Sequence, residues 1–148
     1  MKQLVLFDDP AIRAGLLPFT FTRPVADIRV GILRVAEKWA HHLSAEVGYL
    51  TQDFLQEKFP LLPEATLFIN GACLPDAALV EAVAALQEGE SIWQEQTLIA
   101  YQGLRRSFRW RRYPKRGARC FQGRCVSSAT LGISFFKTDK RFVTISPC

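Results

Sequence analysis

Short apolar runs and stripes of helical spacing alternate along the first part of the chain. A continuous apolar run at residues 3–7 predicts a short strand that is buried on both faces, as in a parallel sheet. The stretches at 47–50 and 66–69 predict a second and a third strand. From Asp27, a plausible N-cap, the period changes to that of a helix. The apolar residues of this helical stripe are Ile28, Ile32, Val35, Ala36, Trp39 and Leu43.

The next elements continue the same alternation. A short helix is expected over residues 52–58 after a cap at Thr51, and a longer helix is expected to have Pro75 in its first turn. Residues 91–93 and 97–101 have the pattern of two strands in a hairpin. Because strands that alternate with helices form βαβ units, the sequence predicts an α/β fold with a mostly parallel sheet.

The segment LLPFTFTRPVADIRVG, residues 16–31, follows the carboxyl end of the first predicted strand. Ligands of open α/β sheets bind at the carboxyl ends of the strands. Pro24 restricts Arg23 to extended conformations, and Thr20 and Thr22 alternate in the same stretch, which would put both hydroxyls on one side. We therefore predict an anion-docking loop, with a plain surface connection as the alternative.

Charge is divided unevenly along the chain. Residues 1–103 carry 7 Lys and Arg against 13 Asp and Glu, a net charge of −6, whereas residues 104–148 carry 12 against 1, a net charge of +11. Basic residues interleaved with aromatic ones suit phosphate contacts and base stacking, so non-specific nucleic-acid binding by this end is one hypothesis. A frameshift or truncation is the hypothesis that we favour, because out-of-frame translation of a GC-rich gene gives such Arg- and Cys-rich strings.

Several classes of protein are disfavoured by the sequence. Asp8 and Asp9 cut the first apolar run too short for a secretory signal, and no uncharged stretch is long enough to span a bilayer. The four cysteines lack the paired spacing and the nearby histidines of a zinc site, so free thiols in a reducing compartment are expected. We therefore expect a cytoplasmic protein without a membrane partner.

Two stretches resemble a known bacterial family. LVLFDDPAIRAGLLPFTFTRPVADIRVGILRVAEKW and INGACLPDAALVEAVAALQEGESIW, with the segment between them, resemble GlmU-like sugar nucleotidyltransferases over about residues 1–101. The resemblance implies a Rossmann-like three-layer core, Mg²⁺ as cofactor, and a nucleoside triphosphate and a sugar 1-phosphate as substrates. Members of the family are longer and add a left-handed β-helix, whose hexapeptide pattern does not occur here.

The resemblance also predicts how the chain is organised. Residues 1–103 would form an incomplete nucleotidyltransferase domain, and residues 104–148 a basic, irregular segment. Such a chain would make a nucleotide sugar and pyrophosphate only as part of a longer protein, so we expect it to be inactive alone. A non-catalytic fragment is the remaining alternative.

Nucleotidyl transfer requires cations that hold the phosphates. Arg13 and Arg23 are the candidate catalytic cations, because a guanidinium makes bidentate contacts with phosphate. Pairing of Arg13 with Asp8 or Asp9 is the structural alternative for that residue. Arg29 is expected on a solvated helix surface. The candidate substrate-binding residues are Thr20, Thr22 and the turn pair Asn70 and Gly71.

The sequence departs from the resembling family at the expected metal ligand. In related nucleotidyltransferases a strand ends in Gly-Asp, and that aspartate holds magnesium, but Ala72 takes the corresponding place here. Acids at strand ends and helix starts more often close turns or cap helices. Oxygen ligands for a hard cation are left at three positions, Asp8, Asp9 and Asp76.

Overall fold

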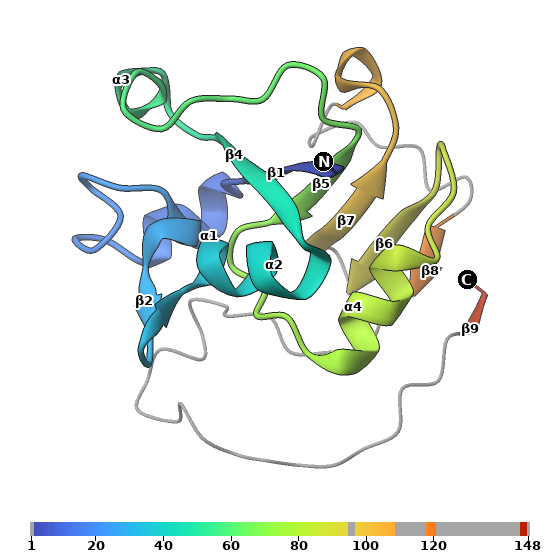
Figure 1. Cartoon of the computed structure of the whole chain (residues 1–148). Helices are drawn as coiled ribbons and strands as arrows, with labels where there is room; N and C mark the ends of the chain where they lie inside the picture. Colours follow the sequence, from blue (N-terminus) through green and yellow to red (C-terminus); the bar gives the residue numbers. More distant parts are fainter. Residues whose placement is uncertain (1, 95–96, 109–117, 121–145, 148) are drawn as a thin grey trace.

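The computed structural model describes residues 2–94, 97–108, 118–120 and 146–147, and of residues 107, 118–120 and 146–147 only the backbone. A mixed β-sheet forms its centre, with the strand order β4-β1-β5-β7-β6-β8-β9 (Figure 1). The strands of this sheet are β1 (Lys2–Phe7), β4 (Ala45–Leu50), β5 (Leu67–Asn70), β6 (Ser91–Gln94), β7 (Thr97–Gln102), β8 (Ala118–Cys120) and β9 (Ser146–Pro147).

The strands of the sheet run in both directions. β4 and β5 are parallel to β1, which lies between them. β7 is antiparallel to β5 and forms a hairpin with β6, as the sequence predicted. β8 is parallel to β6, and β9 is antiparallel to β8. The α/β class and a Rossmann-like core are therefore confirmed, although the sheet is mixed rather than mostly parallel.

Helices α2 (Val35–Leu43) and α4 (Ala77–Ala84) cover one face of the sheet (Figure 1). Trp39 of α2 is fully buried there, and its indole N–H donates to the carbonyl oxygen of Cys73 at 2.8 Å. Cys73 is disulfide-bonded, so the expectation of free thiols is wrong for this residue. The most buried apolar side chains of this face include Leu4, Leu6, Ile69, Leu79, Val83, Ile92 and Ile99.

Aromatic side chains close the opposite face of the sheet. The ring of Phe108, which follows the 3₁₀ turn η2 (Arg105–Ser107), stacks on Phe68 with 4.4 Å between ring centroids and 10° between ring planes. It also lies 5.0 Å from the ring of Phe7. The packed core therefore continues past Gly103 to Phe108. The other buried apolar residues of this face are Val5, Ala65, Leu98 and Tyr101.

The helix that we expected from Asp27 begins eight residues later, at Val35. The 3₁₀ turn η1 (Val25–Asp27) and a small antiparallel hairpin of β2 (Arg29–Val30) and β3 (Leu33–Arg34) precede it. Gly31 has a φ of 76° at the turn of this hairpin, a conformation that glycine adopts without strain. Ile32 is 87 % exposed and belongs to no buried stripe.

Two smaller expectations on helix ends need adjustment. The helix expected over residues 52–58 is the single turn α3 (Asp53–Gln56), with Gln52 rather than Thr51 at its N-cap. α4 begins after Pro75, and Asp76 is its N-cap. α1 (Pro10–Gly15) is a short helix between β1 and the segment that begins at Leu16. Among the described residues, no helix is long and apolar enough to cross a membrane.

Gly48 lies on β4, where residue 62 passes closely over it. A Cβ atom at Gly48 would lie 2.7 Å from the backbone nitrogen and 2.8 Å from the Cγ of Leu62. Because the nearest atom belongs to the backbone, the crossing segment would have to move. We expect Gly48→Ala to lower the free energy of unfolding by about 1–3 kcal/mol.

Urea unfolding, followed by circular dichroism, measures this effect. Glu46→Ala is the control, because Glu46 is an exposed residue of the same strand, and its loss should change the free energy by less than about 0.5 kcal/mol. Equal unfolding midpoints for the two variants would contradict the close approach of residue 62 to β4.

Candidate functional site

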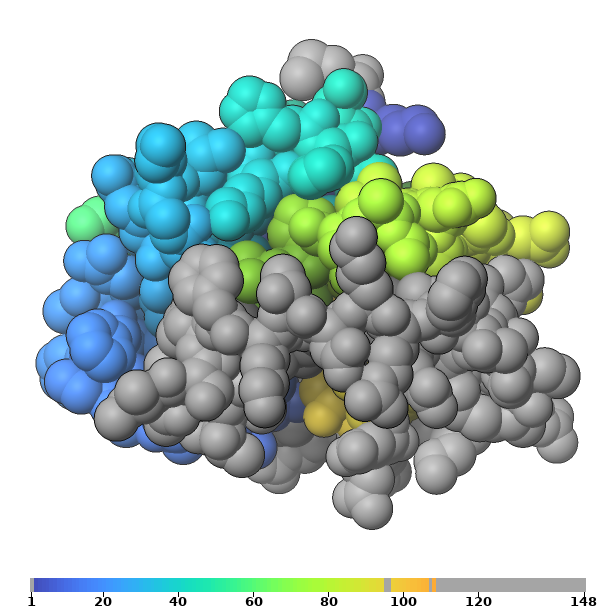
Figure 2. All heavy atoms as spheres, turned by 90° about the horizontal axis from the view of Figure 1, so that it is seen from below, coloured from blue at the N-terminus to red at the C-terminus, as the bar shows by residue number. Residues whose placement is uncertain are grey.

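A pocket of about 470 Å³ lies between the segment 16–30, here called the pocket loop, and the residues that follow β5. Gly71 and Ala72 form its floor at the carboxyl end of β5, and Val35 of α2 contributes to its wall. In Figure 2 the blue surface of the pocket loop and the yellow-green surface of α4 lie on either side of α2. The apolar side chains that the pocket loop adds are Leu16, Pro18, Phe19, Val25, Ile28 and Val30.

Three polar side chains complete the lining of the pocket. Thr22, Arg23 and Arg29 are all exposed and all come from the pocket loop. The described residues provide no hydrogen bond or ion pair to the guanidinium of Arg23 or to that of Arg29. Two cations and a hydroxyl in an apolar hollow suit an anion that carries a ring or another apolar group.

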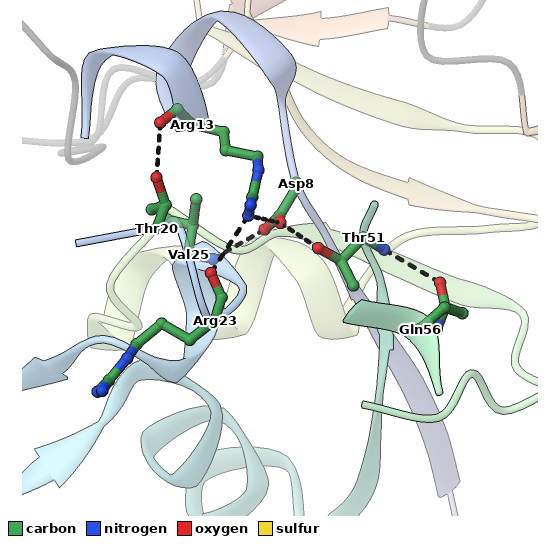
Figure 3. A network of polar contacts seen from close by, with 7 residues as sticks. All are labelled: Asp8, Arg13, Thr20, Arg23, Val25, Thr51 and Gln56. Atoms are coloured by element: carbon green, nitrogen blue, oxygen red, sulfur yellow. Dashed lines mark hydrogen bonds and ion pairs between the residues drawn. The ribbon is translucent and has the colours of Figure 1, made fainter. Parts of the chain in front are cut away.

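The carboxylate of Asp8, directly after β1, anchors the pocket loop (Figure 3). Its Oδ1 accepts the backbone N–H of Val25 at 2.9 Å. Its Oδ2 accepts the Thr51 hydroxyl at 2.6 Å and an N–H of the Arg13 guanidinium at 3.1 Å. Asp8 also donates its own backbone N–H to the carbonyl of Leu50 at 2.9 Å. The end of β1, the start of the loop after β4 and the pocket loop are thus joined at one side chain.

Arg13 of α1 is the second centre of this network. Its side chain is 8 % exposed and that of Asp8 is 3 % exposed, so the ion pair is buried. The same Nη1 atom that binds Asp8 also donates to the carbonyl oxygen of Arg23 at 3.2 Å. The Thr20 hydroxyl donates to the carbonyl oxygen of Arg13 at 2.8 Å, which ties the beginning of the pocket loop to α1.

Burial is the largest cause of the shifted pKa values of Asp8 and Tyr49. Removal from water raises the pKa of Asp8 above its usual value, although Thr51, Val25 and Arg13 each favour the ionised form. Burial also raises the pKa of Tyr49, and the negative charge of Asp27 adds to this effect. Both groups therefore favour their neutral forms more than they would in water.

The structure places the predicted cations in different environments. Arg23 lines the pocket as expected. Arg13 makes the ion pair with Asp8 that we considered as its structural alternative, and it does not line the pocket. Arg29, which we expected on a solvated helix surface, lines the pocket because its segment is a strand of the β2–β3 hairpin. The hydrophobic pattern carried no signal for this role.

Two of the four predicted substrate-binding residues, Thr20 and Asn70, have side chains that are bonded to other parts of the chain. Thr20 is fully buried, so the expectation that its hydroxyl lies on the same side as that of Thr22 is wrong. Asn70 is also buried, donates to the carbonyl of Leu98 at 3.0 Å and accepts the N–H of Ala72 at 3.0 Å. Its side chain shapes the turn after β5. Thr22 and Gly71 line the pocket and stay candidates.

The carboxylates proposed for magnesium do not fit a metal site. Asp9 caps α1 by accepting the N–H of Ala11 at 2.9 Å, and Asp76 caps α4 by accepting the N–H of Leu79 at 2.7 Å. Asp8 already accepts three hydrogen bonds. Within the described part of the chain, no group of three or more His, Cys, Asp or Glu residues is placed to hold a metal ion. Both carboxylate oxygens of Asp8, and one oxygen each of Asp9 and Asp76, already accept hydrogen bonds from the chain.

Comparison with known proteins gives one result that bears on function. No curated protein and no solved structure matches the chain. A sequence model of the family described as "Sugar nucleotidyl transferase" matches residues 4–124, which include the whole lining of the pocket. The match continues past Gly103, so it covers more of the chain than the resemblance found in the sequence. The chain therefore belongs to the sugar nucleotidyl transferase family.

Proposed function

We propose that this chain provides the phosphate-binding part of an enzyme that joins a nucleoside triphosphate to a sugar 1-phosphate. The position of Arg23 is the observation that carries the proposal. Its guanidinium is exposed in the pocket beyond the carboxyl ends of β1 and β5, where α/β sheets bind their ligands. Membership of the sugar nucleotidyl transferase family supplies the class of substrate.

The chemistry of the pocket suits such a substrate. Arg23 and Arg29 supply cations for phosphate oxygens, and Thr22 supplies a hydroxyl that can donate to them. The apolar wall, including Phe19 and Val30, suits a base or a sugar ring. Each part of a phosphorylated nucleoside therefore has a complementary part of the pocket.

The proposed reaction needs charge stabilisation more than it needs covalent chemistry. A sugar-phosphate oxygen forms a bond to the α-phosphorus while the bond from that phosphorus to the pyrophosphate oxygen breaks, and pyrophosphate leaves. The Arg23 guanidinium would bind phosphate oxygens and stabilise the charge that develops on them. The described residues contain no fitting site for Mg²⁺, so we assign no step to the ion.

The expectations for the basic end of the chain stay predictions. Most of residues 104–148 lie outside the described residues, and so do the proposed change of reading frame and the nucleic-acid contacts. The family match favours nucleotidyl transfer over nucleic-acid binding as the main function. The division at residue 103, the inactivity of the chain alone and its cytoplasmic location are likewise untested.

Substitution of Arg23 tests the proposed function. We expect Arg23→Ala to weaken the binding of a nucleoside triphosphate by about tenfold or more, because a charge-assisted hydrogen bond contributes about 1.5–3 kcal/mol. Isothermal titration calorimetry with ATP, GTP, CTP, UTP and dTTP, each with and without MgCl₂, measures the effect on the 148-residue chain.

Lys58→Ala is the control, because it removes one positive charge at an exposed position outside the pocket lining. Its affinity should stay within about twofold of the original chain. Unchanged affinity in Arg23→Ala, with the circular dichroism spectrum preserved, would show that Arg23 does not bind the anion. The pocket loop would then be a plain surface connection. Weakening by both variants alike would indicate non-specific attraction of the anion.

A further inference from the structure

We propose that the buried Asp8–Arg13 pair positions Arg23 for phosphate, and that neither member of the pair binds the phosphate itself. The inference rests on the proposed function, in which Arg23 is the phosphate ligand. It assigns a role to two residues that the sequence had suggested as a metal ligand and a catalytic cation. Both become positioning residues, which act on the ligand only through Arg23.

A single nitrogen atom joins the pair to the pocket loop. Nη1 of Arg13 lies 3.1 Å from Oδ2 of Asp8 and 3.2 Å from the carbonyl oxygen of Arg23. The Arg23 side chain extends away from this network, so its guanidinium is not part of it (Figure 3). Arg13 therefore holds the Arg23 backbone and leaves the Arg23 side chain available to a ligand.

Asp8 holds the chain on the other side of Pro24. Its Oδ1 accepts the N–H of Val25 at 2.9 Å, so the peptide groups before and after Pro24 are both bound by the pair. Pro24 itself has a φ of −63°, which its ring fixes. The backbone from Arg23 to Val25 is thus held by one restricted dihedral angle and two hydrogen bonds.

The pair is in turn attached to the centre of the sheet. Asp8 follows the last residue of β1 directly, and the Thr51 hydroxyl, just after β4, binds the same carboxylate oxygen as Arg13 at 2.6 Å. The floor of the pocket follows β5, the other neighbour of β1, and the N–H of Gly71 donates to the carbonyl of Phe7 at 2.9 Å. The geometry of Arg23 relative to the floor is therefore set through adjacent strands.

A contribution to stability does not by itself explain why the chain has a buried ion pair here. Two charges that are almost fully removed from water lose much hydration, and apolar residues of similar volume often stabilise a core equally well. A backbone held in one conformation, however, lowers the entropy that a phosphate ligand would otherwise have to remove on binding. Positioning of Arg23 accounts for the two hydrogen bonds to the pocket loop as well as for the pair.

A double-mutant cycle between Arg13 and Arg23 tests this role, with inorganic pyrophosphate as the calorimetric probe. We expect Arg13→Met to weaken pyrophosphate binding by about tenfold when Arg23 is present. In an Arg23→Ala background the same change should matter by less than about twofold, since the group that it positions is gone. Lys58→Met, which removes one positive charge at an exposed position outside the pocket lining, should leave the affinity within about twofold in both backgrounds.

Each other outcome of the cycle overturns the proposal. Equal losses in both backgrounds would show that Arg13 acts on the anion directly or on the pocket as a whole. A loss in Arg23→Ala together with no loss in Arg13→Met would leave the proposed function standing and remove only the positioning role. No loss in Arg23→Ala would refute the proposed function, and the positioning role with it.

A second variant allows the test to be made if Arg13→Met does not fold. Arg13→Met leaves the Asp8 carboxylate without its cation, so the Asp8→Asn/Arg13→Met double variant replaces it where circular dichroism shows unfolding. This double variant contains no unpaired charge at the pair and lacks the bond to the Arg23 carbonyl. Relative to the original chain it should bind pyrophosphate about tenfold more weakly, whereas in the Arg23→Ala background the same two changes should matter by less than about twofold. Equal losses in both backgrounds would again overturn the proposal.

Discussion

Replacing Phe108 by alanine should lower the free energy of unfolding by about 3–5 kcal/mol, as large-to-small changes of buried aromatic residues do. The Phe108 ring is 9 % exposed and lies within aromatic contact distance of three rings, those of Phe7, Phe68 and Tyr101. Its removal would leave a cavity against the face of the sheet that α2 and α4 do not cover. Urea unfolding of the 148-residue chain measures the change.

Phe21→Ala is the matched control for this prediction. Phe21 is 66 % exposed, so the same chemical change at that position should alter the free energy of unfolding by less than about 0.5 kcal/mol. Equal effects of the two substitutions would show that Phe108 is not part of the folded core. The expected difference would show that the folded domain includes residues beyond Gly103, in agreement with the extent of the family match.

Prediction from the sequence worked best where one local pattern decided the structure. The continuous apolar run at 3–7 predicted β1 to within one residue, because a strand covered on both faces needs no alternation. The short stretches at 47–50 and 66–69 predicted β4 and β5 to within two residues. The hairpin of β6 and β7 followed from two β-rich runs with a short connection.

The segment after Asp27 shows where a local pattern is ambiguous. Ile28, Ile32 and Val35 have helical spacing, but the glycine between them allows a hairpin turn that leaves Ile32 in solvent. Asp27 accepts a hydrogen bond from Arg34 at 2.9 Å across this hairpin instead of capping a helix. The choice between the two structures depends on contacts with the rest of the chain, which periodicity does not contain.

The sequence indicated some residues of the candidate site and missed the positions of others. Pro24 and the position after β1 indicated Arg23, and the alternative of an Asp8–Arg13 ion pair could be stated in advance because both residues lie near the end of β1. The role of Arg29 and the burial of Thr20 depend on how the pocket loop folds back on α1 and α2. Residues far apart in the chain decide that path, so no local pattern indicates it.

The three acidic residues suggested as metal ligands all have partners within the described part of the chain. Asp9 and Asp76 each precede a helix, and each accepts a backbone N–H there, which is the common role of an acid at that place. Asp8 is the exception, because it binds partners from three segments, and two of them, Val25 and Thr51, are far from it in the sequence. The structural role of Asp8 is therefore to join those segments.

Replacing Arg13 by methionine should destabilise the fold by about 3–5 kcal/mol, because it leaves the Asp8 carboxylate buried without its cation. The raised pKa of Asp8 already shows that burial outweighs the groups that favour its charge. The same change at Arg34, whose side chain is 45 % exposed in its ion pair with Asp27, should cost less than about 1 kcal/mol. Urea unfolding at neutral pH compares the two variants.

The Asp8→Asn/Arg13→Met double variant decides between charge and shape as the cause of this loss. If the unpaired carboxylate is responsible, the double variant should be more stable than Arg13→Met alone, although one more residue has changed. The Asn side chain retains an oxygen for the Val25 N–H, so the anchor of the pocket loop is preserved in part. A further loss of stability in the double variant would show instead that Asp8 contributes through its own hydrogen bonds to Thr51 and Val25, and that the ion pair itself adds little.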